Sequence, residues 1–132
     1  MKIVVATAFL ALASTAAFAG SHSGASTFQN TCSNIAFQYG ADGSAQISAV
    51  CLKSDGMPNQ TSIAMPPIGN NNGMLELGGS AATFQMSCGS ITLDAEVDGV
   101  TLYANCRTSS GEFMETSIPV PGINNSDGTL TN

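Results

Sequence analysis

The chain has 132 residues, with nine acidic and three basic side chains and a formal net charge of −6. A surface this acidic repels phosphate backbones and anionic lipid headgroups, which argues against nucleic acid partners and against electrostatic docking to membranes. We expect neutral partners.

The first 19 residues have the organisation of a secretory signal peptide. Lys2 is the positive start, an apolar, Ala-rich stretch runs to Phe18, and the small residues Ala17 and Ala19 fit cleavage after Ala19. The stretch is short for a bilayer span and has no basic flank. We therefore predict a secreted, extracellular protein without a membrane attachment after removal of residues 1–19, and a flexible Gly/Ser-rich segment over residues 20–27.

The rest of the chain, residues 28–132, is predicted to be one domain built from a tandem repeat, with copies at 28–79 and 80–132. The aligned copies match at many positions, among them Phe28 with Phe84, Cys32 with Cys88, Ile35 with Ile91, Cys51 with Cys106, Ile63 with Ile118, Ile68 with Ile123, and Leu75 with Leu130. Both cysteines of each copy stay in phase, so duplication explains the pattern.

The four cysteines predict two disulfide bonds, because an exported chain folds in an oxidising compartment. If each copy closes its own bridge, Cys32 pairs with Cys51 and Cys88 with Cys106, and each loop contributes about 3 kcal/mol to a small core. A four-cysteine zinc site is the rival interpretation, and the absence of close C-x-x-C pairs argues against it.

Each copy is predicted to begin with a β-hairpin. In the second copy, Ile91, Leu93, Ala95 and Val97 alternate with polar residues, Asp98 and Gly99 make the turn, and the alternation resumes from Val100 to Cys106. The first copy is similar, with its turn near Asp42 and Gly43. A strand follows at 62–65 and at 117–120, ended by Pro66 and Pro121, and each copy finishes in an Asn/Gly turn at 69–73 and 124–128. The only helical signal is a possible turn near Phe28 and Phe84.

The doubled motif F-x-x-[TS]-C-x-x-I, a hairpin, A-x-C, [TS]-S-I and N-x-[DN]-G-x-L resembles the cyanovirin-N homologue family over residues 28–130. The resemblance implies an all-β fold of two pseudo-symmetric halves of short antiparallel strands that exchange strands. It also implies a carbohydrate-binding lectin, in most members one for α1,2-linked mannose, with up to one site in each half. The implied partners are oligosaccharides or glycoproteins, and the implied chain is a monomer or a domain-swapped dimer with a hinge near residues 77–80. No cofactor or metal is implied.

Carried over by position, the resemblance implies two sites. The first would use Asn30, Thr31, Lys53, Ser54, Asn125 and Asp127. The second would use Asn70, Asn72, Thr83, Ser87, Thr108 and Ser109, together with Met86. We expect the second site to be weaker, because Met86 and Ala82 replace polar residues and Asn72 stands where an Asp is usual. Asn, Ser, Thr and Asp can pair with sugar hydroxyls without requiring a charged ligand. The Asn and Asp residues among them are equally typical of tight turns.

Two other functions remain open at this point. A secreted glycosidase needs a pair of carboxylates, but Asp94, Glu96 and Asp98 are predicted on the solvent face of a strand, and the only histidine, His22, lies in the flexible segment. A structural or interaction module could keep the fold without binding sugar. Two N-glycosylation sequons are present: Asn59 is predicted to lie in a harmless turn, and a glycan on Asn124 is predicted to crowd the first site.

Overall fold

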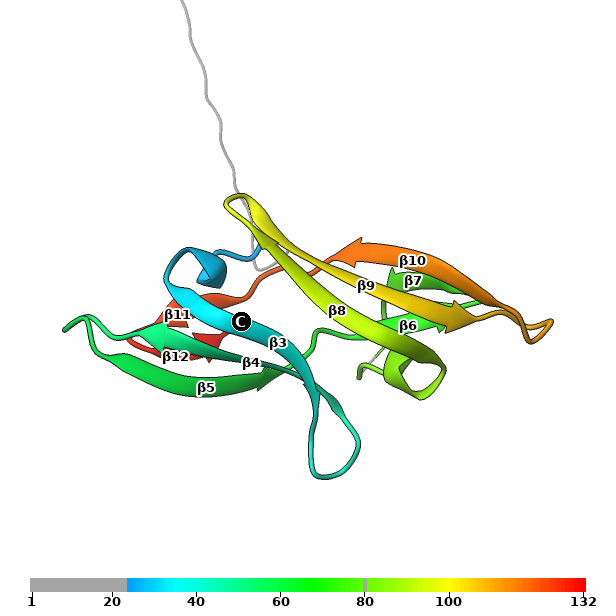
Figure 1. Cartoon of the computed structure of the whole chain (residues 1–132), viewed down its shortest axis with the longest axis horizontal. Coiled ribbons are helices and arrows are strands. Elements are labelled where there is room, and N and C mark those ends of the chain that lie inside the picture. Colours follow the sequence, from blue (N-terminus) through cyan, green and yellow to red (C-terminus); the bar gives the residue numbers. More distant parts are fainter. Residues whose placement is uncertain (1–23, 80) are drawn as a thin grey trace, which may run out of the picture.

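The computed structural model describes residues 24–79 and 81–132, so the predicted signal peptide and His22 lie outside the described residues. Almost all of the regular secondary structure in the described chain is β-strand (Figure 1). Within these two ranges no helix is long and apolar enough to cross a membrane.

Each repeat forms a three-stranded antiparallel sheet that follows one turn of 3-10 helix. In the first repeat, η4 (Phe28–Asn30) leads into β3 (Cys32–Tyr39), β4 (Ala45–Leu52) and β5 (Pro58–Ala64), in the order β3-β4-β5. In the second repeat, η5 (Phe84–Met86) leads into β8 (Cys88–Glu96), β9 (Gly99–Arg107) and β10 (Phe113–Pro119), in the order β10-β9-β8. The predicted turns near Phe28 and Phe84 are thus confirmed as 3-10 helices.

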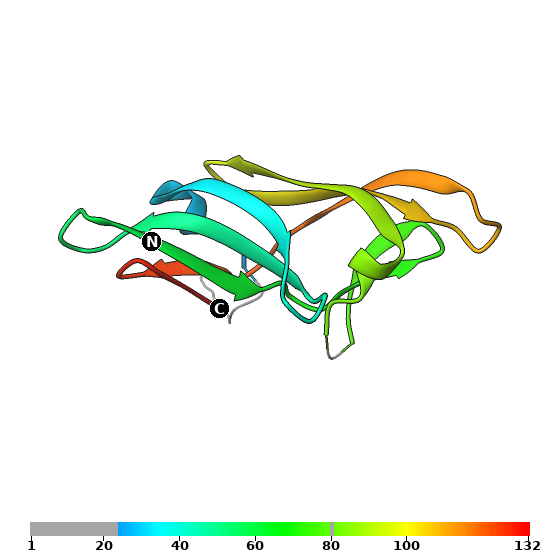
Figure 2. The ribbon, with the colours of Figure 1, turned by 60° about the horizontal axis from the view of Figure 1, so that its bottom comes forward.

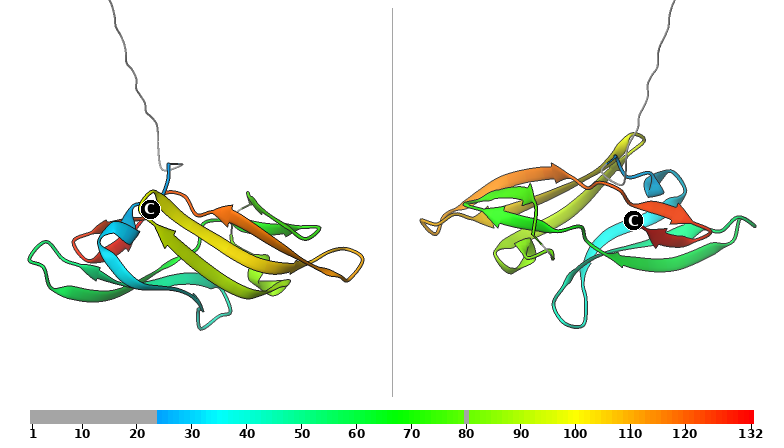
Figure 3. Two further views of the ribbon diagram at one scale, coloured as in Figure 1. Left: turned by 45° about the horizontal axis from the view of Figure 1, so that its top comes forward. Right: turned by 180° about the vertical axis from the view of Figure 1, so that it is seen from behind.

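Each repeat ends in a two-stranded hairpin, β6–β7 (Ile68–Asn71 and Met74–Leu77) or β11–β12 (Asn124–Ser126 and Thr129–Thr131). These segments were predicted only as turns, and that prediction was incomplete. The hairpins are exchanged: the backbone N–H of Leu130 in β12 donates to Thr61 Oγ1 in β5 (3.2 Å), and that of Leu75 in β7 donates to Thr116 Oγ1 in β10 (3.2 Å). Figure 3 shows β11–β12 beside β5 and β6–β7 beside β10.

The molecule therefore has two halves of mixed origin, which lie side by side in Figure 2. Half A consists of η4, β3–β5 and the exchanged β11–β12 hairpin. Half B consists of η5, β8–β10 and the exchanged β6–β7 hairpin. This arrangement confirms the predicted all-β fold with strand exchange between its halves.

The core follows the predicted alternation. Every second residue of the central strands is buried, namely Ala45, Ile47, Ala49 and Cys51 of β4 and Val100, Leu102, Ala104 and Cys106 of β9. Phe28, Phe84, Ile68 and Ile123 are fully buried around them. Disulfides join Cys32 to Cys51 and Cys88 to Cys106, the pairing that the repeat predicts, and each bridge links two directly paired strands.

The hairpin of the second repeat turns one residue earlier than predicted. Glu96 pairs with Gly99, so Val97 and Asp98 form a two-residue loop and Gly99 already belongs to β9. Asp94, Glu96 and Asp98 are exposed, as the alternation predicts.

Part of the segment predicted to be flexible is fixed. The hydroxyl of Ser26 is buried, donates to the carbonyl of Val120 (2.6 Å) and accepts the N–H of Ile123 (3.0 Å). Ala25 also forms a bridge with Pro121. The N-terminal residues therefore bind the crossover between β10 and the exchanged β11–β12 hairpin, because buried crossover groups need partners.

We predict opposite effects on stability for two repeat-matched glutamines. Gln85 Nε2 donates to the carbonyls of Gly43 (3.3 Å) and Ala82 (3.2 Å), and only its Oε1 is buried without a partner, whereas both polar atoms of Gln29 are buried without a partner in the described structure. Since a buried unpaired amide costs about 1–3 kcal/mol, Gln29→Met should raise the free energy of unfolding by about 1 kcal/mol, and Gln85→Met should lower it by about the same amount. Urea denaturation of the oxidised variants measures both, and a shift in the same direction would contradict this assignment.

Candidate functional site

The predicted first site forms a shallow hollow in half A. The hollow has a volume of about 400 Å³ and is lined by Thr31, Leu52, Lys53, Ser54, Gly56, Asn125 and Asp127. Five of the six predicted residues line it, and Asn30 does not. Leu52 and Gly56 were missed, although the outward direction of Leu52 follows from its place next to buried Cys51 in a strand. Residues of both repeats meet here because β11–β12 is exchanged.

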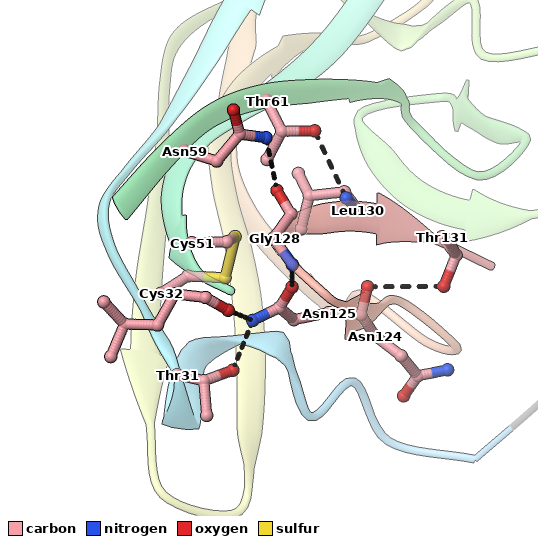
Figure 4. The surroundings of a disulfide bond; sticks show 11 residues. Thr31, Cys32, Cys51, Asn59, Thr61, Asn124, Asn125, Gly128, Leu130 and Thr131 are labelled. Atoms are coloured by element: carbon pink, nitrogen blue, oxygen red, sulfur yellow. Dashed lines mark hydrogen bonds between the residues drawn. A yellow bond between two sulfur atoms is a disulfide. The ribbon is translucent and has the colours of Figure 1, made fainter. Parts of the chain in front are cut away.

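Asn125 is a clamp for this exchanged hairpin. Its Nδ2 donates to Thr31 Oγ1 (2.9 Å) and to the carbonyl of Leu52 (2.9 Å), and its Oδ1 accepts the N–H of Gly128 (2.8 Å) (Figure 4). Both amide hydrogens are therefore used within the protein. The geometry gives Asn125 a structural role at the edge of the hollow, so the turn interpretation describes it better than a sugar contact does.

Asp127 is attached to the opposite wall by one oxygen only. Its Oδ1 accepts both the N–H and the hydroxyl of Ser54, each at 2.8 Å. Its Oδ2 has no hydrogen bond to the described part of the chain and faces solvent as an acceptor. The backbone N–H of Ser54 is the main reason that the pKa of Asp127 is lowered, followed by the Ser54 hydroxyl, and Lys53 lowers it further. The carboxylate is therefore ionised at neutral pH.

Close approach of the hairpin to the hollow requires a glycine. Gly128 has φ +89°, and a Cβ on it would lie 2.5 Å from Lys53 Cγ. The aliphatic part of Lys53 thus packs against the backbone of the exchanged hairpin. This contact explains why Lys53 lines the hollow.

The second predicted site repeats the clamp. Asn70 Nδ2 donates to Ser87 Oγ (2.9 Å) and to the carbonyl of Arg107 (2.9 Å), and Asn72 Oδ1 accepts the N–H (2.9 Å) and hydroxyl (2.8 Å) of Ser109. Asn72 Nδ2 has no hydrogen bond within the described part of the chain. Half B therefore presents a donor at the place where half A presents the acceptor Asp127 Oδ2.

A hollow of about 490 Å³ in half B has a different lining: Met86, Ser87, Cys88, Gly89, Arg107 and Phe113. Of the predicted second-site residues, Met86 and Ser87 line this hollow. Thr83 is the cap residue before η5, and Thr108 Oγ1 is hydrogen-bonded to Ser110 Oγ at 2.8 Å. A third hollow, of about 330 Å³, lies beside residues 24–25 and contains none of the predicted site residues.

Comparison with known proteins agrees with this architecture. Residues 28–131 match the family model of the CVNH domain. The chain belongs to the CVNH family. Among solved CVNH structures, the fold is similar to microvirin in complex with mannobiose, at 33% identity and a TM-score of 0.59, covering 80% of this chain and 96% of microvirin.

Two fungal CVNH structures are also similar. The protein from Gibberella zeae is 26% identical with a TM-score of 0.56, covering 80% of this chain and 95% of that one. The protein from T. borchii is 26% identical with a TM-score of 0.61, covering 80% and 97%. No curated protein sequence matches the chain.

The two sequons lie differently from the prediction. Asn59 is in strand β5, not in a turn, and its Nδ2 donates to the carbonyl of Gly128 (2.8 Å). Asn124 is exposed in β11, and neighbouring strand residues point to opposite faces. Figure 4 shows its side chain pointing away from Asn125. The geometry therefore argues against crowding of the hollow by a glycan on Asn124.

We predict that a glycan on Asn59 loosens the β11–β12 hairpin, because it is attached at the nitrogen that holds Gly128. A glycan on Asn124 should leave stability and binding unchanged. The measurement compares thermal unfolding of protein from a eukaryotic secretory host, separated by glycoform and mapped by mass, with unglycosylated bacterial protein. Equal melting temperatures for the Asn59 glycoform and the bare protein would exclude this role of the Asn59 amide.

The unequal pair Asp127 and Asn72 predicts a pH effect in half A alone. Because the pKa of Asp127 is lowered in the folded protein, the stabilisation it gives is complete above about pH 4 and is lost as the pH falls through the folded-state pKa. NMR spectra recorded from about pH 6 to about pH 2 should show the Ser54 amide shifting below about pH 4, while the Ser109 amide, bonded to the non-titrating Asn72, stays in place. Asp127→Asn should abolish the shift at Ser54. A shift of equal size at Ser109 would show that the two contacts are not the cause.

Proposed function

We propose that this protein is a lectin that binds neutral, mannose-type oligosaccharides in the half A hollow. One observation carries the proposal: the hollow places free polar groups of both kinds around an apolar contact. The Thr31 hydroxyl accepts from Asn125 and keeps its own proton to donate, and Asp127 Oδ2 accepts. Leu52 is 48% exposed and offers an apolar surface to the C–H face of a sugar ring.

Sugar recognition fits this set because a pyranose combines hydroxyl donors and acceptors with apolar ring faces. A carboxylate oxygen forms stronger hydrogen bonds to hydroxyls than a neutral acceptor does. The similarity to microvirin, whose structure holds mannobiose, supports the choice of sugar. Glycoproteins that display such oligosaccharides are the proposed macromolecular partners.

The same hollow supports binding rather than hydrolysis. Asp127 is the one carboxylate among its lining residues, whereas glycoside hydrolysis uses two carboxyl groups that flank the bond. Asp55, the nearest acidic residue in sequence to Ser54, accepts the N–H of Met57 in its own turn (2.9 Å).

We also propose that the protein acts outside the cell. The predicted signal peptide and the two disulfides support export, since such bridges persist in oxidising compartments. N-terminal sequencing of protein from the culture medium tests this, with Gly20 expected as the first residue.

The function is tested with Asp127→Asn, which keeps the Oδ1 contact to Ser54 and changes only the free oxygen to an NH₂ group. We expect its affinity for α1,2-mannobiose to fall about tenfold or more, because the hydroxyl donor of the sugar loses its acceptor. Titration calorimetry or NMR titration measures the change.

The matched control is Asn72→Ala in half B, which should leave mannobiose affinity unchanged. If the two variants weaken binding equally, the half A hollow is not the main site. If neither the wild type nor any glycan on an array binds, the chain is a structural or interaction module instead.

A further inference from the structure

The half B hollow shares two repeat-matched lining positions with the half A hollow, Ser87 with Thr31 and Arg107 with Leu52, and otherwise extends over different residues. At repeat-matched places, Arg107 replaces Leu52, Phe113 replaces Pro58, Met86 replaces Asn30 and Gly89 replaces Ser33. The backbone scaffold is the same, since Leu52 pairs with Pro58 across β4 and β5 as Arg107 pairs with Phe113 across β9 and β10. The repeated backbone scaffold therefore presents a cation and apolar groups in half B.

Arg107 is positioned to bind an anionic group. Its guanidinium carbon lies 5.3 Å from the centre of the Phe113 ring, a cation–π contact that fixes the planar group. Among residues 24–79 and 81–132, no carboxylate lies within 4.0 Å of the guanidinium as an ion-pair partner. Its backbone is fixed as well, because the N–H of Arg107 donates to the carbonyl of Ser87 (2.9 Å) and the carbonyl of Arg107 accepts from Asn70 Nδ2 (2.9 Å).

The remaining lining suits a sugar ring. Met86 is 82% exposed and Phe113 59% exposed, so both offer apolar surface to ring C–H groups. Ser87 Oγ accepts from Asn70 and keeps its proton to donate. A Cβ on Gly89 would meet no atom within 4 Å, so the glycine leaves the hollow open.

We propose that the half B hollow binds an acidic saccharide, a hexuronate unit whose carboxylate pairs with Arg107 and whose ring lies against Met86 and Phe113. The proposal rests on the saccharide-binding function proposed above and gives the second half a ligand class of its own. A guanidinium and a carboxylate can form two parallel hydrogen bonds. The net charge of −6 opposes long polyanions, which limits the ligand to short or sparsely charged glycans.

Three carboxylates lie on the same sheet face, and Glu115 is the nearest of them in register to Arg107. The other two, Asp94 and Glu96 of β8, lie further along β9, opposite Thr101 and Gly99. Glu115 pairs with Asn105, the neighbouring same-face position to the Arg107–Phe113 pair. It lowers the local positive potential, so Glu115→Gln should strengthen uronate binding about two- to threefold at low salt.

The test is an NMR titration of the oxidised chain with trigalacturonate and with its methyl ester, which has the same ring and no charge. We expect shifts at Ser87, Gly89 and Phe113, with the ester binding about tenfold more weakly. Arg107→Leu, which installs the residue of half A, should abolish uronate binding, and Arg107→Lys should weaken it. Gly89→Leu should also block it with the charge intact.

Mannobiose titration of the same samples tests the lectin function separately. Arg107→Leu should leave the NMR shifts that mannobiose causes at Thr31 and Ser54 unchanged, and these shifts show that half A of the variant is folded. Equal binding of trigalacturonate and its ester, or uronate shifts that persist in Arg107→Leu, would overturn the acidic-sugar site while leaving the half A site standing. Failure of mannobiose with uronate binding intact would overturn the half A site alone.

Discussion

The fold depends on one constraint: a two-stranded hairpin of three or four residues per strand cannot bury enough surface to be stable alone. Each terminal hairpin is therefore completed by the sheet of the other repeat. The contact is made by an asparagine, Asn125 in half A and Asn70 in half B. Its two amide hydrogens bind the residue after the 3-10 turn and the last residue of the central strand of the other repeat, and its oxygen binds the turn of its own hairpin. The clamp joins residues as far as 94 positions apart. The hydrogen bonds from Leu130 to Thr61 and from Leu75 to Thr116 reinforce it.

The same clamp helps to form the half A hollow, the proposed sugar site. Docking of the exchanged hairpin brings Asp127 to Ser54, next to the disulfide-linked ends of β3 and β4, so the hollow exists only in the assembled fold. The glycine that follows Asp127 lets the hairpin approach the Lys53 stem. Two residues of one turn thus have different roles. Asn125 uses both of its amide hydrogens within the protein, whereas Asp127 keeps one carboxylate oxygen free for the proposed ligand. The proposed sugar therefore contacts a side of the hollow whose position is fixed by folding.

Duplication explains how two hollows with different lining residues can share one backbone scaffold. The disulfides, the 3-10 turns, the clamps and the Ser contacts of Asp127 and Asn72 are repeated in both halves. The side chains of Leu52 and Arg107 are not constrained by those contacts, because they project from exposed strand positions. Replacement of Leu52 by Arg107 at the matched position keeps the cross-strand pair and changes the charge of the hollow. The repeated frame is therefore held by buried contacts, and the two hollows differ in a few exposed side chains.

The sequence by itself determined the repeat, the disulfide pairing, the two long hairpins with their buried faces and the identity of most half A lining residues. These features follow from local period-two patterns and from cysteines in phase. The terminal hairpins escaped detection because their strands are short and rich in Asn and Gly, which are typical of turns. Only the tertiary structure decided that Asn125 is a clamp, that Asn30 stays outside the hollow, that the Asn59 amide holds Gly128, and that the half B hollow is formed around Arg107. The reason is physical: which polar atoms remain free for a ligand depends on hydrogen bonds between segments far apart in the chain, and no local pattern records those bonds.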